Sequence, residues 1–220
     1  MEFAGGGGRS RRPGTTRSKR PLGGVLVASM AVAGSYLAAR TGSGDVTDER
    51  VRQLLTTVEP ARTDRIISVA TDLGSLGGLA GVSGVLAGTG HRRTAATVLA
   101  SGLTAWTAAQ SVKPLLDRDR PYELGTSRRL VSPPVGSAWP SGHAAVAAAM
   151  MTAIWPELPA TPSGRITRVL GAATAVAVGL SRIRVGVHHL TDVVAGLGVG
   201  VLSARAAQLV LRRRDRKVAR

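Results

Sequence analysis

The sequence has 220 residues and no cysteine, and its 29 Lys and Arg outnumber 13 Asp and Glu to give a net charge of +16. This length fits one domain or two small ones, and the absence of cysteine excludes a disulfide scaffold, a thiolate metal site and a cysteine nucleophile. Long apolar runs exclude a chain disordered throughout. The positive charge is typical of nucleic-acid-binding proteins, but here long apolar segments are almost free of charge, which argues against that class.

Six apolar segments predict membrane-spanning helices, because roughly 20 apolar residues cross a hydrocarbon core about 30 Å thick. They are 21–39, 66–70 with 73–90, 94–112, 143–155, 166–187 and 190–211. The fourth is short, and the last two carry Arg near their ends, where the side chain can extend to the interface. A soluble bundle is disfavoured, because its helices are rarely this free of charge. We therefore predict an all-α polytopic membrane bundle of six transmembrane helices.

The remaining parts of the chain are basic. Residues 1–20 predict a disordered basic tail, residues 21–211 the membrane domain, and residues 212–220 a second basic tail. The side that holds both termini carries more than half of the Lys and Arg but few acidic residues, which predicts cytoplasmic termini. Composition favours the plasma membrane of a bacterium. A signal peptide cleaved near Ala33 is disfavoured, because the apolar run continues beyond that residue.

The loop between the first two spans contains a helical pattern. After Thr47, a suitable N-cap, the residues Val51, Leu54, Leu55 and Val58 lie on one face of a helix. This pattern fits an amphipathic helix lying on the outer membrane surface, or a connector packed on the bundle. We favour the connector.

Three groups of polar residues fall on the extracytoplasmic side of this topology. They occupy residues 113–121, 139–143 and 181–192, where spans end or begin. Ionisable residues at membrane depth are costly, so each group is a candidate functional site. Taken singly, the groups have ordinary explanations: a basic loop at the lipid headgroups, a helix N-terminus, and an ion pair between Arg182 and Asp192. Their common location argues for an active site on the extracytoplasmic side.

The cations among these residues suit a phosphate dianion. Lys113, Arg120 and Arg182 supply permanent positive charge, with planar forks from the two arginines. Ser141 and the backbone N–H of Gly142, at a helix start, add neutral donors.

The histidines suit phosphoryl transfer through a covalent intermediate. His188 and Asp192 are four residues apart, so on a helix the carboxylate can hold one ring nitrogen and leave the other to attack phosphorus. His143 would then protonate the leaving group. His189 is three residues from Asp192, so spacing alone does not exclude it as the nucleophile.

The three groups resemble the signature of the type-2 phosphatidic acid phosphatase (lipid phosphate phosphatase) superfamily. That signature is Lys, six residues, Arg-Pro; then Pro-Ser-Gly-His; then Ser-Arg, five residues, His, three residues, Asp. It reads here as Lys113 with Arg120-Pro121, Pro140-Ser141-Gly142-His143, and Ser181-Arg182 with His188 and Asp192. All parts match in order and spacing, and the resemblance covers about residues 47–211.

The resemblance implies a core of six membrane helices and a set of site residues. Phosphate would be bound by Lys113, Arg120 and Arg182 with hydrogen bonds from Ser141 and Gly142, while His188 forms the phosphohistidine, Asp192 orients it and His143 protonates the leaving group. The count of five intervening residues makes His188 the match rather than His189. No metal or other cofactor is required in that scheme.

We therefore expect a membrane phosphatase, a phosphoric monoester hydrolase, whose partners are the bilayer and a lipid phosphate, with no nucleic acid. Phosphatidic acid, phosphatidylglycerophosphate and polyprenyl phosphates or diphosphates all fit, and neither the lipid nor the oligomeric state follows from these residues. One alternative is a non-catalytic lipid-phosphate-binding or scramblase-like protein, which the intact His143, His188 and Asp192 disfavour. Another is a vanadate-dependent haloperoxidase, which the spans and small size disfavour.

Overall fold

The computed structural model describes residues 22–56, 67 and 70–218, and in this part of the chain all regular structure is helical. The helices are α1 (Leu22–Thr41), α2 (Asp45–Thr56), η1 (Thr71–Gly74), α4 (Leu76–Gly88), α5 (Arg92–Val112), η2 (Lys113–Leu115), α6 (Gly142–Ile154), η3 (Trp155–Glu157), α7 (Pro162–Arg184) and α8 (Leu190–Val218). The predicted all-α class is confirmed for these residues. The predicted tail 1–20 lies outside them.

Four predicted spans coincide closely with α1, α5, α7 and α8, although α8 continues beyond Leu211 into the basic C-terminal segment. The other two spans correspond to α4 and α6, which have 13 residues each. At 1.5 Å per residue such a helix is about 20 Å long, less than the thickness of a hydrocarbon core. By length and composition, three described helices can cross a membrane: α1, α7 and the Leu190–Arg214 part of α8.

The outward faces of two long helices are apolar. On α1, Leu22, Leu26, Val27 and Met30 are each about two-thirds exposed or more, and α7 exposes several Ile, Val and Leu residues to a similar degree. Apolar surface of this extent on a long helix is typical of contact with lipid. Together with the length of the helices, it marks the chain as a membrane protein.

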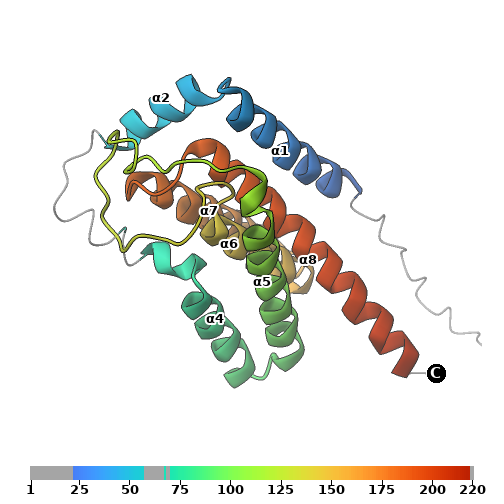
Figure 1. Cartoon of the computed structure of the whole chain (residues 1–220). Helices are drawn as coiled ribbons and strands as arrows, with labels where there is room; N and C mark the ends of the chain where they lie inside the picture. The colour runs from blue at the N-terminus through green and yellow to red at the C-terminus, as the bar shows by residue number, and fades with distance from the viewer. Residues whose placement is uncertain (1–21, 57–66, 68–69, 219–220) are drawn as a thin grey trace, which may run out of the picture.

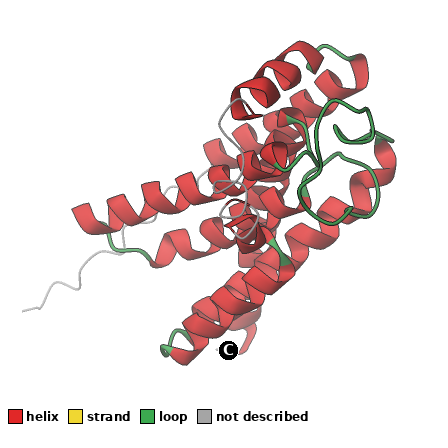
Figure 2. Cartoon of the chain, turned by 90° about the vertical axis from the view of Figure 1, so that its left-hand side faces the viewer, coloured by secondary structure: helices red, strands yellow, loops and turns green. Residues whose placement is uncertain are grey.

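Helix α6 lies at the centre of the bundle, where it packs against α5, α7 and α8 (Figure 1). Its residues from Ala144 to Met150 are all buried. Because this helix is enclosed by protein, its length and alanine-rich composition are set by neighbouring helices rather than by lipid. Figure 2 shows in green the loops that connect the helices at the ends of the bundle. The longest of the described loops covers residues 116–141.

Close contact between α6 and α8 depends on two glycines of α8. A Cβ atom on Gly196 would lie 2.3 Å from the carbonyl oxygen of Ser141, and one on Gly200 would lie 2.2 Å from that of Ala145. Small residues four apart let two helix backbones approach closely, as in membrane helix pairs. This contact places the start of α6 beside the first turns of α8.

Replacing Gly196 with Ala is expected to destabilise the fold by about 1–3 kcal/mol, because the added methyl group overpacks the α6–α8 contact. The measurement is thermal unfolding in detergent. Gly81→Ala on α4 is the matched control, since its Cβ would meet nothing within 4 Å and alanine favours a helix by up to about 1 kcal/mol. Equal melting temperatures for the two variants would contradict the role of Gly196.

Helix α2 packs against α7 and α8 near one end of the bundle (Figure 1). Val51 and Leu55 contact the buried cluster around Ile183, whereas Leu54 is 66% exposed. The helix begins at Asp45, before the expected cap at Thr47. This segment is therefore packed on the bundle, as the connector interpretation predicts. Of the residues expected on its apolar face, Val51 and Leu55 are packed, Leu54 is not, and Val58 lies outside the described residues.

Candidate active site

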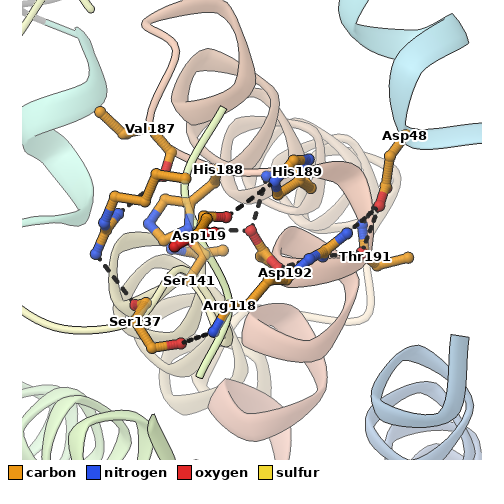
Figure 3. A network of polar contacts seen from close by, with 12 residues as sticks. Asp48, Arg118, Asp119, Ser137, Ser141, Val187, His188, His189, Thr191 and Asp192 are labelled. Atoms are coloured by element: carbon orange, nitrogen blue, oxygen red, sulfur yellow. Dashed lines mark hydrogen bonds and ion pairs between the residues drawn. The ribbon is translucent and has the colours of Figure 1, made fainter. Parts of the chain in front are cut away.

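The three polar groups meet at one end of the bundle. Chain direction alternates from α5 to α8, so the end of α5 with η2, the start of α6, the end of α7 and the start of α8 all lie there. Hydrogen bonds join the groups: Ser141 N–H donates to the carbonyl of Asp192 at 2.9 Å, and Arg120 Nη1 donates to the carbonyl of Val187 at 2.8 Å. Figure 3 shows Ser141, Val187, His188 and Asp192 close to one another in this network.

Asp192 lies at the centre of this network and is fully buried. Its Oδ1 accepts a hydrogen bond from Arg118 Nη1 at 2.7 Å, and its Oδ2 accepts one from the backbone N–H of His189 at 2.7 Å. The second bond is a capping interaction, because Asp192 stands in the first turn of α8 and reaches back to the residue before the helix. The helix N-terminus also favours a negative charge here. The carboxylate is therefore held in one orientation.

His188 stands beside this carboxylate, and 3% of its surface is exposed. Its Nδ1 lies 3.5 Å from Asp192 Oδ2, slightly beyond hydrogen-bond length, and has no other polar partner among the described residues. Since Nδ1 faces Asp192, Nε2 on the opposite side of the ring is the nitrogen available for chemistry. Burial lowers the pKa of His188 to about 4, against the opposing influence of Asp192. The ring is neutral at pH 7 and retains a lone pair for attack.

His189, the alternative nucleophile, is placed differently. Its ring Nε2 lies 3.2 Å from the carbonyl oxygen of Asp119, and its backbone N–H, not its ring, contacts Asp192. Of the two neighbouring histidines, His188 is the one whose ring faces the carboxylate.

The turn between α7 and α8 fixes the position of His188. Gly186 has φ +77°, and a Cβ atom there would lie 2.5 Å from the carbonyl oxygen of Arg128. A side chain is excluded by both the backbone conformation and the space. The N–H groups of Val187 and His188 then donate to the carbonyl of Arg182 at 3.2 and 3.3 Å. This backbone brings His188 next to Arg182, and the bond from Arg120 to the carbonyl of Val187 also holds the turn.

Lys113 and Arg120 are both buried and share one backbone acceptor. Arg120 Nη2 donates to the carbonyls of Gly136 and Ser137 at 2.8 and 3.1 Å, and Lys113 Nζ donates to the carbonyl of Ser137. Burial, with the nearby Arg120, lowers the pKa of Lys113 to about 8, and burial also lowers the pKa of Arg120. Two cations held this close on neutral carbonyl groups create a site that attracts an anion.

Arg182 adds a third cation from the last turn of α7 and is 4% exposed. Its Nη1 donates to Thr71 Oγ1 at 3.0 Å, while its buried Nε has no partner in the part of the chain that the structure describes. The charges of Arg120 and Arg182 both act on His188 and favour its neutral form. The cationic cluster and the histidine therefore form one electrostatic unit.

The start of α6 supplies the remaining predicted residues. Ser141 is fully buried and is the N-cap, with its Oγ 3.5 Å from the N–H of Ala144. Gly142 and His143 follow as the first two residues of the helix. Free backbone N–H groups at a helix start attract anions. Within the described residues, no cluster of three or more His, Asp or Glu is arranged to hold a metal ion.

Some contacts differ from the sequence-based alternatives. Asp192 pairs with Arg118 rather than with Arg182, whose side chain contacts Thr71 instead. Sequence reasoning did not single out Arg118 or Asp48, which meet at 2.7 Å. Asp48 could have been noticed as an acid three residues before Val51 on the apolar face of the α2 helix.

The family model of the PAP2 superfamily matches residues 94–216, which is more than half of the chain and includes all three polar groups. The chain therefore belongs to the PAP2 superfamily, as the resemblance of its signature predicts.

Two solved structures share the fold. The crystal structure of the first transmembrane PAP2 type phosphatidylglycerolphosphate phosphatase from Bacillus subtilis matches with a TM-score of 0.71 and 22% identity, over 88% of this chain and 96% of that one. The crystal structure of Aquifex aeolicus LpxE matches with a TM-score of 0.62 and 19% identity, over 72% and 93%. At these identities the similarity is one of fold.

Proposed function

We propose that this protein is an integral membrane phosphatase that hydrolyses a lipid phosphomonoester or diphosphate through a phosphohistidine. The observation that carries the proposal is the buried pair of His188 and Asp192 beside a cluster of cations held on neutral groups. Membership of the PAP2 superfamily supports it. So does the phosphatase activity named for the Bacillus subtilis protein, which points to phosphatidylglycerophosphate as one substrate to test.

In the first step, Nε2 of His188 attacks phosphorus and the bond between phosphorus and the lipid oxygen breaks. With a phosphomonoester, His143 donates a proton to the departing oxygen, so that an alcohol leaves rather than an alkoxide. With a diphosphate, the terminal phosphorus is attacked, its bond to the bridging oxygen breaks, and the lipid monophosphate leaves. Asp192 stabilises the positive charge that develops on the His188 ring. In the second step, water attacks phosphorus and His143 takes a proton from the water. The bond between phosphorus and Nε2 breaks, so that inorganic phosphate leaves and the neutral His188 ring is restored.

The phosphate oxygens would be bound by the cations and by the start of α6. Lys113, Arg120 and Arg182 balance the charge of the dianion, and the latter two also offer planar pairs of donors. Ser141 and the N–H of Gly142 add neutral donors aimed at the same oxygens. Backbone carbonyl groups already hold Lys113 and Arg120, and the hydroxyl of Thr71 holds Arg182, so little reorganisation should accompany the reaction.

We also propose that residues 21–211 form six membrane spans between the basic tails 1–20 and 212–220, with both termini in the cytoplasm of a bacterium. The alternating direction of α5 to α8 supports this arrangement, because it collects the site at one end of the bundle. The basic C-terminal end of α8 lies at the opposite end of that helix. The active site would then face the extracytoplasmic side.

The test is release of inorganic phosphate by the purified protein in detergent, with a chelator present. The panel contains phosphatidic acid, phosphatidylglycerophosphate, a polyprenyl phosphate and a polyprenyl diphosphate, with the His188→Ala variant as a control for contaminating phosphatases. We expect release by the wild type alone. No release from any substrate by a folded protein would refute the proposed activity in favour of a non-catalytic protein. Loss with chelator that added metal restores would refute the metal-free mechanism.

The lowered pKa of Lys113 predicts a limit at alkaline pH. Lys113 binds phosphate when protonated, so kcat/KM should fall above about pH 8, where the free protein loses this proton. In Lys113→Arg the charge persists, and the alkaline limb should move up by roughly one pH unit or more. The measurement is kcat/KM from pH 5 to pH 10 for both proteins. An alkaline limb at the same pH in both would assign it to another group.

A further inference from the structure

Arg118 joins the active site to helix α2. From the loop 116–141, its Nη1 donates to Asp192 Oδ1 at 2.7 Å and to Thr191 Oγ1 at 2.6 Å, while its Nη2 donates to Asp48 Oδ2 at 2.7 Å. Figure 3 shows Arg118 between the two carboxylates. Neither Arg118 nor Asp48 is among the phosphate-binding or catalytic residues proposed above.

Asp48 belongs to α2, but its carboxylate is hydrogen-bonded to the first turn of α8. Its side chain is 2% exposed. Its Oδ1 accepts the backbone N–H of Thr191 at 2.9 Å, and its Oδ2 accepts the hydroxyl of Thr191 at 2.8 Å as well as Arg118. The first N–H groups of a helix lack partners within the helix. Asp48 accepts one of these N–H groups, that of Thr191, the residue before Asp192.

Helix α2 is fixed to the bundle at both ends. Near its C-terminus the carbonyl of Leu55 accepts a hydrogen bond from Arg184, and Val51 and Leu55 pack on the cluster around Ile183. Asp48 at the other end therefore occupies a defined place relative to α7 and α8. A carboxylate with such a fixed position can hold a guanidinium in a fixed position.

The hydrogen bond from Arg118 to Oδ1 of Asp192 determines the orientation of the other carboxylate oxygen, Oδ2. With Oδ1 bound to Arg118 and one side of Oδ2 bound to the N–H of His189, the open side of Oδ2 faces His188 Nδ1 at 3.5 Å. Without Asp48, Arg118 keeps only Thr191 and a 3.6 Å approach to the exposed Asp45 besides Asp192. The guanidinium is then held less firmly, the carboxylate can turn, and the His188 ring loses the partner that orients it.

We propose that Asp48 and Arg118 are positioning residues through which α2 orients Asp192 and, by way of it, the nucleophile His188. This inference rests on the proposed phosphohistidine mechanism. Asp48 acts on His188 only through Arg118 and Asp192, and it has no hydrogen bond to the cations that would bind phosphate. Its loss should therefore slow turnover and leave phosphate capture intact.

The test compares Asp48→Asn with Glu49→Gln on a short-chain lipid phosphate in detergent. Both changes remove one negative charge from α2, but Glu49 contacts Arg52 and Gln53 on its own helix and does not reach Arg118. We expect kcat of Asp48→Asn to fall about tenfold or more with KM within about twofold, and Glu49→Gln to match the wild type. Arg118→Lys, which keeps the charge but loses the two-sided fork, should show the same pattern.

The double variant Asp48→Asn with Arg118→Lys separates a shared role from independent ones. If Asp48 acts through Arg118, the double variant loses no more turnover than the more damaging single variant. Multiplied losses would overturn the proposal, and so would a kcat of Asp48→Asn equal to that of Glu49→Gln. If Asp48→Asn does not purify folded, Arg118→Lys tests the same expectation of a lower kcat with an unchanged KM. A rise in the KM of Arg118→Lys as large as the fall in its kcat would also overturn the proposal.

The outcomes also separate this inference from the proposed function. A folded wild type that is inactive on every lipid phosphate would refute the mechanism and the positioning role together. An active wild type with an unaltered Asp48→Asn variant would refute the positioning role alone.

Discussion

Replacing His188 with Ala is expected to reduce phosphate release by roughly four orders of magnitude or more, because the variant lacks the atom that attacks phosphorus. The cationic cluster and His143 would remain, and they account for any residual rate above that in water. The measurement is initial-rate phosphate release under the conditions in which the wild type is active. A folded His188→Ala variant within tenfold of the wild type would exclude this residue as the nucleophile.

The adjacent residue provides the matched control for this experiment. His189→Ala removes an imidazole one position away, whose ring contacts the carbonyl of Asp119 rather than Asp192. We expect this variant to retain activity within several-fold of the wild type, since the backbone N–H that caps α8 is unchanged. The reverse pattern, with His189→Ala inactive and His188→Ala active, would assign the nucleophile to His189. Rapid quenching with labelled substrate should trap phosphohistidine in the wild type and in His189→Ala.

The second large effect is expected for Asp192→Asn, which should lower kcat roughly 10³- to 10⁴-fold, as for other histidines deprived of an orienting carboxylate. Asparagine has the same shape, and its one carbonyl oxygen can still accept the N–H of His189 and so retain the cap of α8, while its amide NH2 group then faces Arg118 without a hydrogen bond. What is lost is the negative charge that balances the imidazolium formed during attack. The measurement is kcat with thermal unfolding alongside it.

Asp119→Asn is the control for this prediction. It removes a carboxylate from the same loop as Arg118, at an exposed position, and should leave kcat near that of the wild type. If Asp192→Asn retained more than a tenth of the activity, the carboxylate would not be required, and the 3.5 Å approach to His188 would have only a structural role.

Much of the helical framework follows from the sequence, because charged residues mark the ends of long apolar runs. The ends of α1, α5 and α7 fall close to those expected. The second segment was harder, because its apolar run conceals a break: Ser75 caps α4 by accepting the N–H of Gly78, and η1 precedes it as a separate turn. The length of α6 depends on burial among neighbouring helices, which one segment's composition does not reveal.

The candidate site likewise contains residues that the sequence identifies as candidates and residues that only the structure reveals. Spacing along the chain brings forward Lys113, His143 and His188 as candidates, since the signature is a linear pattern. It could not select Asp48, which lies 70 positions from Arg118 and meets it only after α2 folds back over the bundle. A side chain that acts through tertiary contacts leaves at most a weak trace in the sequence, in this instance an acid on an apolar helix face.

The close α6–α8 contact has a consequence for how this scaffold can diversify. Ser141 and Asp192 are joined by a backbone hydrogen bond, and Gly196 and Gly200 bring the main chain of α8 against the backbone carbonyls of α6. The proposed acid His143, in the first turn of α6, and the proposed nucleophile His188, in the turn just before α8, are thus positioned by two closely packed main chains. Substitutions on the outward faces of α1 and α7 can then alter which lipid tails are accommodated while the reacting groups stay in place. Mutation of the outer helices is therefore the route by which the same chemistry could be adapted to new lipids.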